Sequence, residues 1–437
     1  MLEFIRRMRV AALFLAGVST GMAAEPVLVD VGKGWARNSV NANILRHNSV
    51  VSHEGIQYTG YYEDDGHVVL AKRALGSAEW DVRKTDLKGN VHDAHNTINL
   101  MIDGAGYLHL SWDHHVHPLR YVRSVEPGSL ELTDKLPMTG EKESRVTYPE
   151  FYRLADGDLL FLYRDGTSGG GDVMMNHYCV ETKTWTRRQD AFINGEGRRN
   201  AYWQMAVDAQ GVLHLAWVWR ATGDVATNHD MGYAKSEDGG KTWLKTDGER
   251  YELPITAANS EYAARIPQGH ELINTTGITA DGRGLPCIVT YWRPAGTEVP
   301  QYHLIHHDGE AWKTSQIGER TTAFSLSGGG TRRIPISRPR VLADAHGGTN
   351  RVFMLFRDIE RGDRVSIAIC DDPANPEWRI EDLTDFSVGM WEPSFDTELW
   401  DREGVLHVYV QEVGQGQGET IENLEPTQVR ILEWKPE

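Results

Sequence analysis

Residues 103–112 read Asp-Gly-Ala-Gly-Tyr-Leu-His-Leu-Ser-Trp, and residues 208–217 read Asp-Ala-Gln-Gly-Val-Leu-His-Leu-Ala-Trp. Each stretch joins a turn rich in Asp and Gly to a strand-like run that ends in an aromatic residue. Looser copies bring the total to seven, and they lie at 53–58, 156–163, 281–291, 344–356 and 401–409. The copies start 50 to 73 residues apart, which leaves room for the four short strands of a propeller blade. The sequence therefore predicts an all-β fold, a seven-bladed β-propeller.

A second hairpin that ends in Trp follows most of these copies, with Trp at positions 80, 185, 243, 312 and 378. One example, Ser-Glu-Asp-Gly-Gly-Lys-Thr-Trp at 236–243, is similar to the S-x-D-x-G-x-T-W Asp box of sialidase-type propellers. In such a box the Asp caps the turn, a Gly adopts positive φ, and the Trp packs between neighbouring sheets. We interpret the box as a feature of the fold and not of the function.

The two ends of the chain predict how the ring of blades closes. The last copy shows only three clear strands, the final one at 427–434, whereas Pro-Val-Leu-Val-Asp-Val at 26–31 reads as a strand without a partner. Because an unpaired edge strand invites aggregation, we expect this N-terminal strand to close the last blade. Residues 25–437 are then a single seven-bladed catalytic propeller.

Residues 1–24 read as a secretory signal peptide. Arg6, Arg7 and Arg9 form a basic region, residues 10–18 are mainly apolar, and small residues at 21–24 suit a cleavage site. The apolar run is too short to cross a membrane. We therefore expect a secreted or periplasmic protein that does not reside in a membrane.

The composition narrows the choice of partner. The net charge of −17 argues against nucleic acid, and an anionic substrate would need a local basic site. Cys179, Cys287 and Cys370 are an odd number, so a complete disulfide framework is not indicated. Nothing in the sequence suggests an obligate partner, and we expect a monomer.

Chemistry-bearing residues gather where a propeller would bring them together. In this fold the innermost strands of all blades line one central channel, so residues just before each Asp/Gly turn strand should converge. These positions are rich in His, Tyr, Trp and Arg; they include 46–48, 92–96, 148–150, 202–204, 338–340 and 391–393. Aromatic rings stack on sugars, and guanidinium groups bind carboxylates or sulfates. The inventory predicts an acidic-glycan site.

Four of these stretches carry a family resemblance: His-Asp-Ala-His-Asn-Thr-Ile-Asn-Leu at 92–100, Asp-His-His at 113–115, Thr-Tyr-Pro at 147–149 and Tyr-Arg-Asp-Gly at 163–166. Together they resemble the bacterial-neuraminidase-repeat propellers that include the ulvan lyases of polysaccharide lyase family 25 and the related family 24. The resemblance implies a lyase that cuts beside a uronate in a sulfated rhamnose–glucuronate glycan and leaves a 4,5-unsaturated uronate. It also implies functional roles for His95, His115, Tyr148, Arg164 and Tyr202.

β-Elimination across C4–C5 of a uronate requires a neutralised carboxylate, a base for the C5 proton and an acid for the leaving oxygen. Arg164 is predicted to hold the carboxylate through paired hydrogen bonds. His95, with an ordinary pKa of about 6.5, is the first candidate for the base. Tyr148 is then the acid, or the base if Arg164 lowers its pKa. The residues alone do not decide between these two assignments, and no cofactor is expected for catalysis.

Five further residues are expected to bind substrate around this trio. His115 would orient the substrate or the catalytic histidine, and Asn96 would support the carboxylate. Tyr202 would stack on a sugar, while Arg220 and Arg338 would bind sulfate. For the arginines, a salt bridge at the rim of the site explains the residue nearly as well.

A structural zinc ion is a further expectation. Cys287 and His303, with His229 and also His270, lie in the strand-rich region of the fourth and fifth copies, and zinc prefers thiolate and imidazole ligands. The family resemblance implies a structural metal there. A buried free thiol is an equally good interpretation of Cys287.

Three other functions compete with the lyase. An exo-α-L-rhamnosidase on the same scaffold could use His47, although hydrolases usually need two carboxylates. A sialidase is disfavoured because the Arg-Ile-Pro stretches at 265–267 and 333–335 come late in the chain. A non-catalytic lectin would explain the aromatic residues and arginines, but not the titratable His and Tyr beside them.

Overall fold

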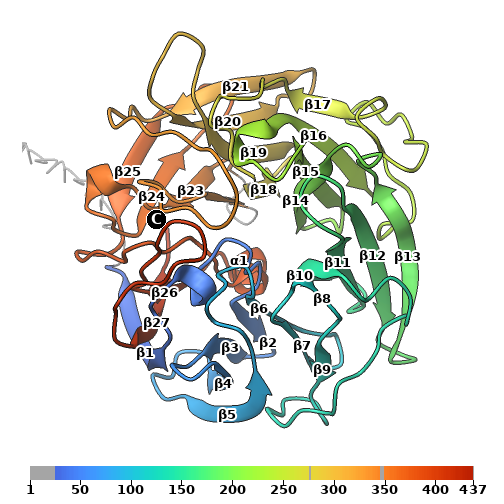
Figure 1. Cartoon of the computed structure of the whole chain (residues 1–437), viewed down its shortest axis with the longest axis vertical. Helices are drawn as coiled ribbons and strands as arrows, with labels where there is room; N and C mark the ends of the chain where they lie inside the picture. The colour runs from blue at the N-terminus through green and yellow to red at the C-terminus, as the bar shows by residue number, and fades with distance from the viewer. Residues whose placement is uncertain (1–24, 275–276, 345–348, 437) are drawn as a thin grey trace, which may run out of the picture.

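A computed structural model describes residues 25–274, 277–344 and 349–436. The strands of this part form seven sheets, which are arranged radially around a central channel (Figure 1). Neighbouring strands within the sheets pair antiparallel; six sheets are local meanders, and the seventh combines strands from both ends of the described chain. The predicted seven-bladed propeller is confirmed.

Blades 1 to 3 come from the N-terminal half of the chain. Blade 1 contains β2 (Val50–His53), β3 (Ile56–Tyr62), β4 (His67–Ala74) and β5 (Asp81–Lys88). Blade 2 contains β6 (Ile98–Ile102), β7 (Leu108–Trp112) and β9 (Tyr121–Arg123). Blade 3 contains β10 (Val146–Arg153), β11 (Leu159–Asp165), β12 (Asp172–Cys179) and β13 (Thr184–Ile193), with the short β8 (His115–His117) paired to β10. The strand β8 thus ties blade 2 to the inner edge of blade 3.

Blades 4 to 7 complete the ring. Blade 4 contains β14 (Asn200–Val207), β15 (Leu213–Arg220), β16 (Asn228–Ser236) and β17 (Glu261–Ala264). Blade 5 contains β18 (Gly277–Ala280), β19 (Pro286–Trp292), β20 (Gln301–His307) and β21 (Trp312–Ile317). Blade 6 contains β22 (Arg340–Ala343), β23 (Val352–Phe356), β24 (Ser366–Cys370) and β25 (Trp378–Asp382). Blade 7 contains β26 (Leu406–Gln411), β27 (Thr427–Trp434) and β1 (Val27–Gly34).

The seven sequence copies mark one place in each blade, the turn that leads into its second strand. The copies at 103–112 and 208–217 join β6 to β7 and β14 to β15. In both turns the leading Asp accepts hydrogen bonds from backbone N–H groups two and four residues later. Blade 7 differs, because the short helix α1 (Thr397–Glu403) stands in front of β26. The repeat is therefore a turn signal, and it recurs because every blade needs that turn.

The Asp box has the structural role predicted for it. Asp238 accepts hydrogen bonds from the backbone N–H groups of Lys241 and Thr242, and Gly240 has a φ of 81°. Trp243 is fully buried and stacks on Phe192 of blade 3, with ring centroids 5.3 Å apart. The box thus fixes a turn and fills the seam between blades 3 and 4.

The ring closes through the two ends of the chain, as predicted. Strand β1 pairs antiparallel with β27, with Val27 opposite Glu433 and Gly34 opposite Thr427. Strand β27 in turn pairs with β26. The N-terminal strand is therefore the outer strand of blade 7, and this pairing satisfies its backbone hydrogen bonds.

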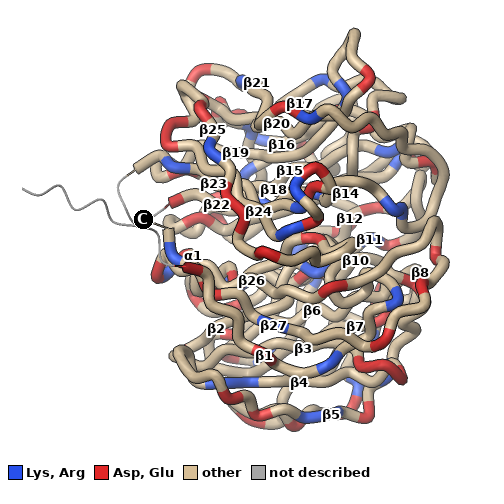
Figure 2. Tube along the Cα trace, turned by 90° about the vertical axis from the view of Figure 1, so that its left-hand side faces the viewer, with Lys and Arg blue, Asp and Glu red and all other residues tan. Residues whose placement is uncertain are grey.

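The remaining global predictions concern export and cysteine chemistry. The predicted signal peptide lies outside the described residues, and none of the described helices is long and apolar enough to span a bilayer. The three cysteines are free thiols; Cys287 and Cys370 are buried. Figure 2 shows acidic residues interspersed with basic ones along the Cα trace, so the net negative charge is spread over the chain.

Candidate active site

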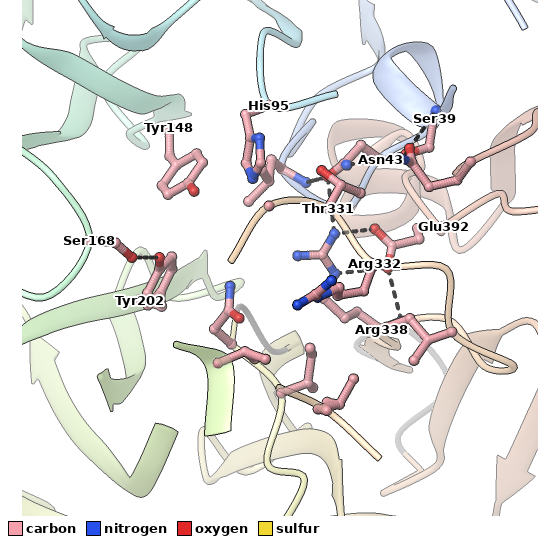
Figure 3. Close-up of a pocket in the computed structure, with 18 of the residues that line it drawn as sticks. Ser39, Asn43, His95, Tyr148, Ser168, Tyr202, Thr331, Arg332, Arg338 and Glu392 are labelled. Atoms are coloured by element: carbon pink, nitrogen blue, oxygen red, sulfur yellow. Dashed lines mark hydrogen bonds and ion pairs between the residues drawn. The ribbon is translucent and has the colours of Figure 1, made fainter. Parts of the chain in front are cut away.

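A pocket of about 900 Å³, measured up to the solvent at its mouth, lies at one end of the central channel (Figure 3). Four predicted site residues line one wall: His95, His115, Tyr148 and Tyr202. Arg220 and Arg338 also line the pocket, whereas Arg164 and Asn96 do not. The structure thus brings most of the predicted residues to one cavity.

Tyr148 reaches the pocket through an irregularity in β10. The pairing of β10 with β11 shifts register between Thr147 and Glu150, and Tyr148 adopts a φ of 54°. This left-handed conformation is costly for a residue with a bulky side chain. A bulge of this kind redirects a side chain next to a functional site, and here the phenol points into the cavity (Figure 3).

His95 is held by two carboxylates. Its Nδ1 lies 2.7 Å from Oδ1 of Asp93 and 3.2 Å from Oε1 of Glu419. Burial alone would lower the pKa of His95, but these two hydrogen-bonded carboxylates outweigh burial and raise the pKa to about 9. The sequence-based expectation of a neutral His95 with an ordinary pKa is therefore wrong. The ring carries a proton near neutral pH, and its Nε2 is the nitrogen left to face a substrate.

Asp93 joins His95 to His115. Its second oxygen lies 2.7 Å from Nδ1 of His115, and the two imidazole rings stack with centroids 4.2 Å apart. Burial and the charge of His95 lower the pKa of His115, although the hydrogen bond to Asp93 opposes this change. The carboxylate of Asp93 is therefore hydrogen-bonded to two imidazole rings, of which His95 is charged and His115 is neutral.

The two tyrosines of the wall form a pair with two guanidinium groups. Their ring centroids are 5.7 Å apart. The guanidinium of Arg164 stacks on both rings, 4.8 Å from the centroid of Tyr148 and 5.4 Å from that of Tyr202. Nη1 of Arg220 donates a hydrogen bond of 3.1 Å to the Tyr202 hydroxyl, which also lies 2.6 Å from Oγ of Ser168.

This arrangement lets the pair lose one proton easily and a second one only with difficulty. Burial opposes ionisation of Tyr202, but the charges of Arg164 and Arg220, with the Ser168 hydrogen bond, lower its pKa to about 7. Burial and the neighbouring Tyr202 raise the pKa of Tyr148. Because the phenols interact, the first deprotonation belongs to the pair and not to one residue. One tyrosinate near neutral pH is the result.

Arg164 occupies a different position from the direct carboxylate clamp expected from the sequence. Its side chain is 1% exposed and its Nε donates to the backbone oxygen of Gly166. Among the described residues it makes neither an ion pair nor a hydrogen bond through the buried Nη1. Arg164 therefore stands behind the tyrosines as a buried positive charge, which a tyrosinate or a substrate carboxylate would offset.

Asn96 and Arg338 are also placed differently from expectation. Asn96 is buried in the loop after His95, where its amide donates to the backbone oxygen of Asn90. Arg338 lines the pocket, but its guanidinium is paired with the carboxylate of Glu392 through Nε at 2.8 Å and Nη2 at 2.5 Å. The rim salt bridge, which was the alternative interpretation for Arg338, is the one that the structure shows.

Two site residues escaped the sequence analysis because they lie in long loops without a strand pattern; Arg332 lines the pocket, and Glu419 contacts His95 from behind it. Arg332 lines the wall opposite the tyrosines (Figure 3), and it makes no ion pair with any residue that the structure describes. Glu419 reaches His95 from the loop between β26 and β27. A loop acidic or basic residue is common at any surface, so no sequence signal singled out these two.

His47, the residue expected to serve a rhamnosidase, lies in a second cavity. That cavity is lined farther along the same inner strands, by Tyr152 of β10 and Gln204 of β14. The rings of His47 and Tyr152 are 4.6 Å apart. His47 is therefore separated along the channel from the pocket that holds His95 and Tyr148, which weakens the rhamnosidase alternative.

The predicted zinc ligands do not come together. Strand pairing places Cys287 opposite His306 and places His303 opposite Thr290. Because side chains alternate along a strand, Cys287 and His303 face opposite sides of the sheet. His303 stacks on Trp292 at 3.5 Å, and His229 contacts Asp230 in blade 4.

Among the described residues, groups of three or more potential ligands occur elsewhere, at Asp93–His95–His115 and at Glu63–Asp65–His67. Their closest contacts, at 2.7 and 2.8 Å, are hydrogen bonds. The predicted trio of His229, Cys287 and His303 does not fit a zinc ion, and Cys287 is a buried thiol.

The model of the BNR repeat-containing family matches residues 56–320, from β3 through β21. The chain belongs to this family. The matched segment contains His95, His115, Tyr148, Arg164, Tyr202 and Arg220. The family resemblance read from the sequence is therefore confirmed, and five of these six residues line one pocket.

Curated relatives of this chain are ulvan lyases. The chain is 25% identical over 282 residues to the short isoform of Alteromonas sp. (strain LOR), and the match covers 52% of each chain. It is 22% identical over 278 residues to the ulvan lyase of Nonlabens ulvanivorans, covering 55% of this chain and 59% of the relative. A long isoform from Glaciecola sp. (strain KUL10) is 27% identical over 157 residues, only 16% of its length. The chain thus spans at most three fifths of these three relatives.

Solved structures support the fold over nearly the whole chain. The polysaccharide lyase Uly1 matches with a TM-score of 0.70 at 16% identity, covering 95% of this chain and 100% of that one. A PL25 ulvan lyase bound to -[GlcA(1-4)Rha3S]- matches with a TM-score of 0.62 at 14% identity, covering 90% and 93%. The seven-bladed architecture is therefore shared with these lyases.

Proposed function

We propose that this protein is a polysaccharide lyase that cleaves a uronate-containing glycan by β-elimination and leaves a 4,5-unsaturated uronate. One observation carries the proposal: a tyrosine pair flanked by two guanidinium groups stands beside an imidazole that two carboxylates hold at its Nδ1. This set supplies a base, an acid and positive charge within one site, as elimination beside a carboxylate requires. The curated relatives and the family membership support the same reaction.

The base in this proposal is the tyrosinate shared by Tyr148 and Tyr202. With a first pKa of about 7, the pair is ionised in much of the protein near neutral pH, and a base is most effective when its pKa is close to the working pH. It takes the proton from C5 of the uronate. This assignment replaces His95, which is already protonated at that pH.

His95 is then the acid that protonates the leaving oxygen. When the C5 proton leaves, its electron pair forms the C4–C5 double bond, the C4–O bond breaks, and Nε2 of His95 supplies the proton that the oxygen needs. Asp93 and Glu419 keep this ring charged and fix its orientation. Neutral His115 remains available to hydrogen-bond a sugar hydroxyl.

The carboxylate of the uronate meets positive charge from two sides. Arg164 stands behind the tyrosines with Nη1 unpaired among the described residues, and Arg332 faces them across the pocket. A bound uronate carboxylate would offset the positive charge of these two guanidinium groups, and neutralising the carboxylate makes the C5 proton more acidic. Arg220 stabilises the tyrosinate through the Tyr202 hydroxyl.

The proposed substrate is an ulvan-type glycan of rhamnose sulfate and glucuronate, which is what the named relatives act on or bind. Incubation with ulvan tests the proposal directly. A conjugated uronate absorbs in the ultraviolet, so a lyase gives rising absorbance together with new chain ends. New reducing ends without absorbance would instead show a hydrolase, and binding without either would show a lectin.

Export and assembly belong to the same proposal. We expect removal of residues 1–24 on secretion or transport to a periplasm, which would place the protein where an extracellular polysaccharide is found. Mass spectrometry of the exported protein tests the cleavage. We also expect a monomer, which light scattering would test.

A further inference from the structure

Resting on the proposed function, we infer that the protein acts on the ends of its polysaccharide and not within the chain. The decisive feature is the rim of the pocket, which is a closed circuit of contacts. A chain interior needs a groove that is open at two ends, so that polymer continues on both sides of the cleaved bond. A closed rim admits only a terminal segment.

One half of the circuit is the wall formed by the proposed catalytic histidine and tyrosines and their neighbours. The rings of His95 and His115 stack at 4.2 Å, and those of His115 and Tyr148 lie 6.3 Å apart. Tyr148 follows Tyr202 at 5.7 Å, and Tyr202 accepts the hydrogen bond from Arg220. This wall runs without a break from blade 2 through blade 3 to blade 4.

The other half is a strap, residues 322–335, which follows blade 5 and is described throughout. At the blade 4 end, Nη2 of Arg220 donates to the backbone oxygen of Gly223. Two residues on, the Val225 N–H donates to the backbone oxygen of Gly328 in the strap at 2.9 Å, and the Gly328 N–H donates to Oδ1 of Asp224 at 2.6 Å. The strap is thereby fastened beside the tyrosine wall.

At its other end the strap is fastened to the histidines. The Thr331 N–H donates to Oε1 of Glu419 at 2.8 Å, and the same carboxylate contacts Nδ1 of His95 and accepts from the Ala94 N–H through its other oxygen. Gly330 packs closely on Gly418: a Cβ atom added to Gly330 would lie 3.1 Å from the Cα atom of Gly418. Glu419 therefore completes the circuit by joining the strap to the catalytic wall.

The lining of the pocket is consistent with a terminal segment. The ion pair of Arg338 and Glu392 lines the pocket from the side of blades 6 and 7. Arg332 lines the strap side of the pocket, where its Nη2 donates to the backbone oxygen of Ser327, so an acidic sugar inserted end-on would lie between this guanidinium and the wall that carries the tyrosines. A polymer that continued on both sides of the cleaved bond would have to pass over the strap on one side, where the circuit of contacts leaves no gap.

Chain ends can be varied while the mass of substrate is held constant. Ulvan is shortened by mild acid to preparations of decreasing mean length, and the initial rate of absorbance is measured at equal, subsaturating mass. End-on action makes the rate rise in proportion to the number of ends, about twofold for each halving of length, with one small product from the first turnovers and little loss of viscosity. A rate independent of length, with an early fall in viscosity, would overturn the inference.

A variant with a shortened strap provides a second test of end-on action. Residues 327–331 are replaced by two glycines, and a matched variant replaces residues 372–376 at the outer edge of blade 6. Opening the strap is expected to produce an early viscosity loss that the matched variant does not show. If wild-type protein gives no absorbance, the lyase proposal fails, and the inference is then decided by binding: bound protein per mass of glycan must rise with the number of ends, and a constant value refutes it.

Discussion

Glu419 controls the charge of His95, and the variant Glu419→Gln isolates that control. Glutamine keeps the size of the side chain and an oxygen that can accept from the Thr331 N–H, but it removes one of the two negative charges at Nδ1 of His95. An opposite charge at this distance changes a pKa by about 1 to 3 units. We take the lower value, because the Glu419 side chain is 31% exposed.

The two pKa values define the active protonation state. The tyrosine pair must have lost a proton, so activity falls as the pH drops through about 7. His95 must hold its proton, so activity falls as the pH rises through about 9. The profile of kcat/KM against pH is therefore expected to be bell-shaped, with a maximum near pH 8.

Lowering the pKa of His95 by about one unit moves only the alkaline limb. At pH 9 the protonated fraction falls from about one half to about one tenth, so kcat/KM should fall about fivefold, whereas at pH 7 the loss stays under about twofold. The assay is the initial rise in ultraviolet absorbance on ulvan from pH 5.5 to 10.5 at constant ionic strength.

Glu422→Gln is the matched control, because Glu422 lies on the same loop but pairs with Arg333. Its profile should coincide with that of the wild type. An alkaline limb that stays at the same pH in Glu419→Gln, or that moves equally in both variants, would refute the assignment of His95 as a protonated acid.

Three further predictions test other parts of the site and the fold. Tyr148→Phe should lower kcat by about 10² to 10⁴ with an unchanged melting temperature. Tyr262→Phe removes a hydroxyl whose hydrogen bond, within the described part of the chain, goes to the backbone oxygen of Ala257, and this variant should retain activity. Arg220→Gln should raise the pKa of the tyrosine pair and move the acidic limb of the profile upward by about one pH unit; an unmoved limb would contradict the role of Arg220. Cys287→Ser should cost about 1 to 3 kcal/mol of unfolding free energy, because it buries a hydroxyl in an apolar core, and denaturant unfolding should show this loss without a change in kcat.

The fold could be predicted because its signal is repeated. An Asp that caps a turn and a Gly that permits it are local requirements, and most of the seven blades present both at the same place. Trp243 could be placed at a blade seam for the same reason, since the residues before it determine its turn. The pairing of β1 with β27 followed from counting strands and edges. These inferences needed no knowledge of distant contacts.

The site was predicted in part, and the errors have physical causes. His95, Tyr148 and Tyr202 could be found because repeat positions bring them to one end of the channel. The charge of His95 could not, because it depends on Glu419, which is more than 300 residues away in the sequence. The prediction of a zinc site was wrong because it depended on strand register. The sequence indicates that Cys287 and His303 lie in neighbouring strands, but it does not show that they face opposite sides of the sheet.

The seam between β1 and β27 has a consequence for the order in which the protein becomes active. Blade 7 needs the first described strand and the last one, so the ring cannot close until nearly the whole chain has been synthesised. The loop that carries Glu419 lies between β26 and β27 and is positioned by that closure. A nascent chain that ends before this loop already contains both tyrosines, but its His95 lacks the second carboxylate and its pocket lacks one side. Formation of the charge state proposed for catalysis is thus coupled to the final step of folding.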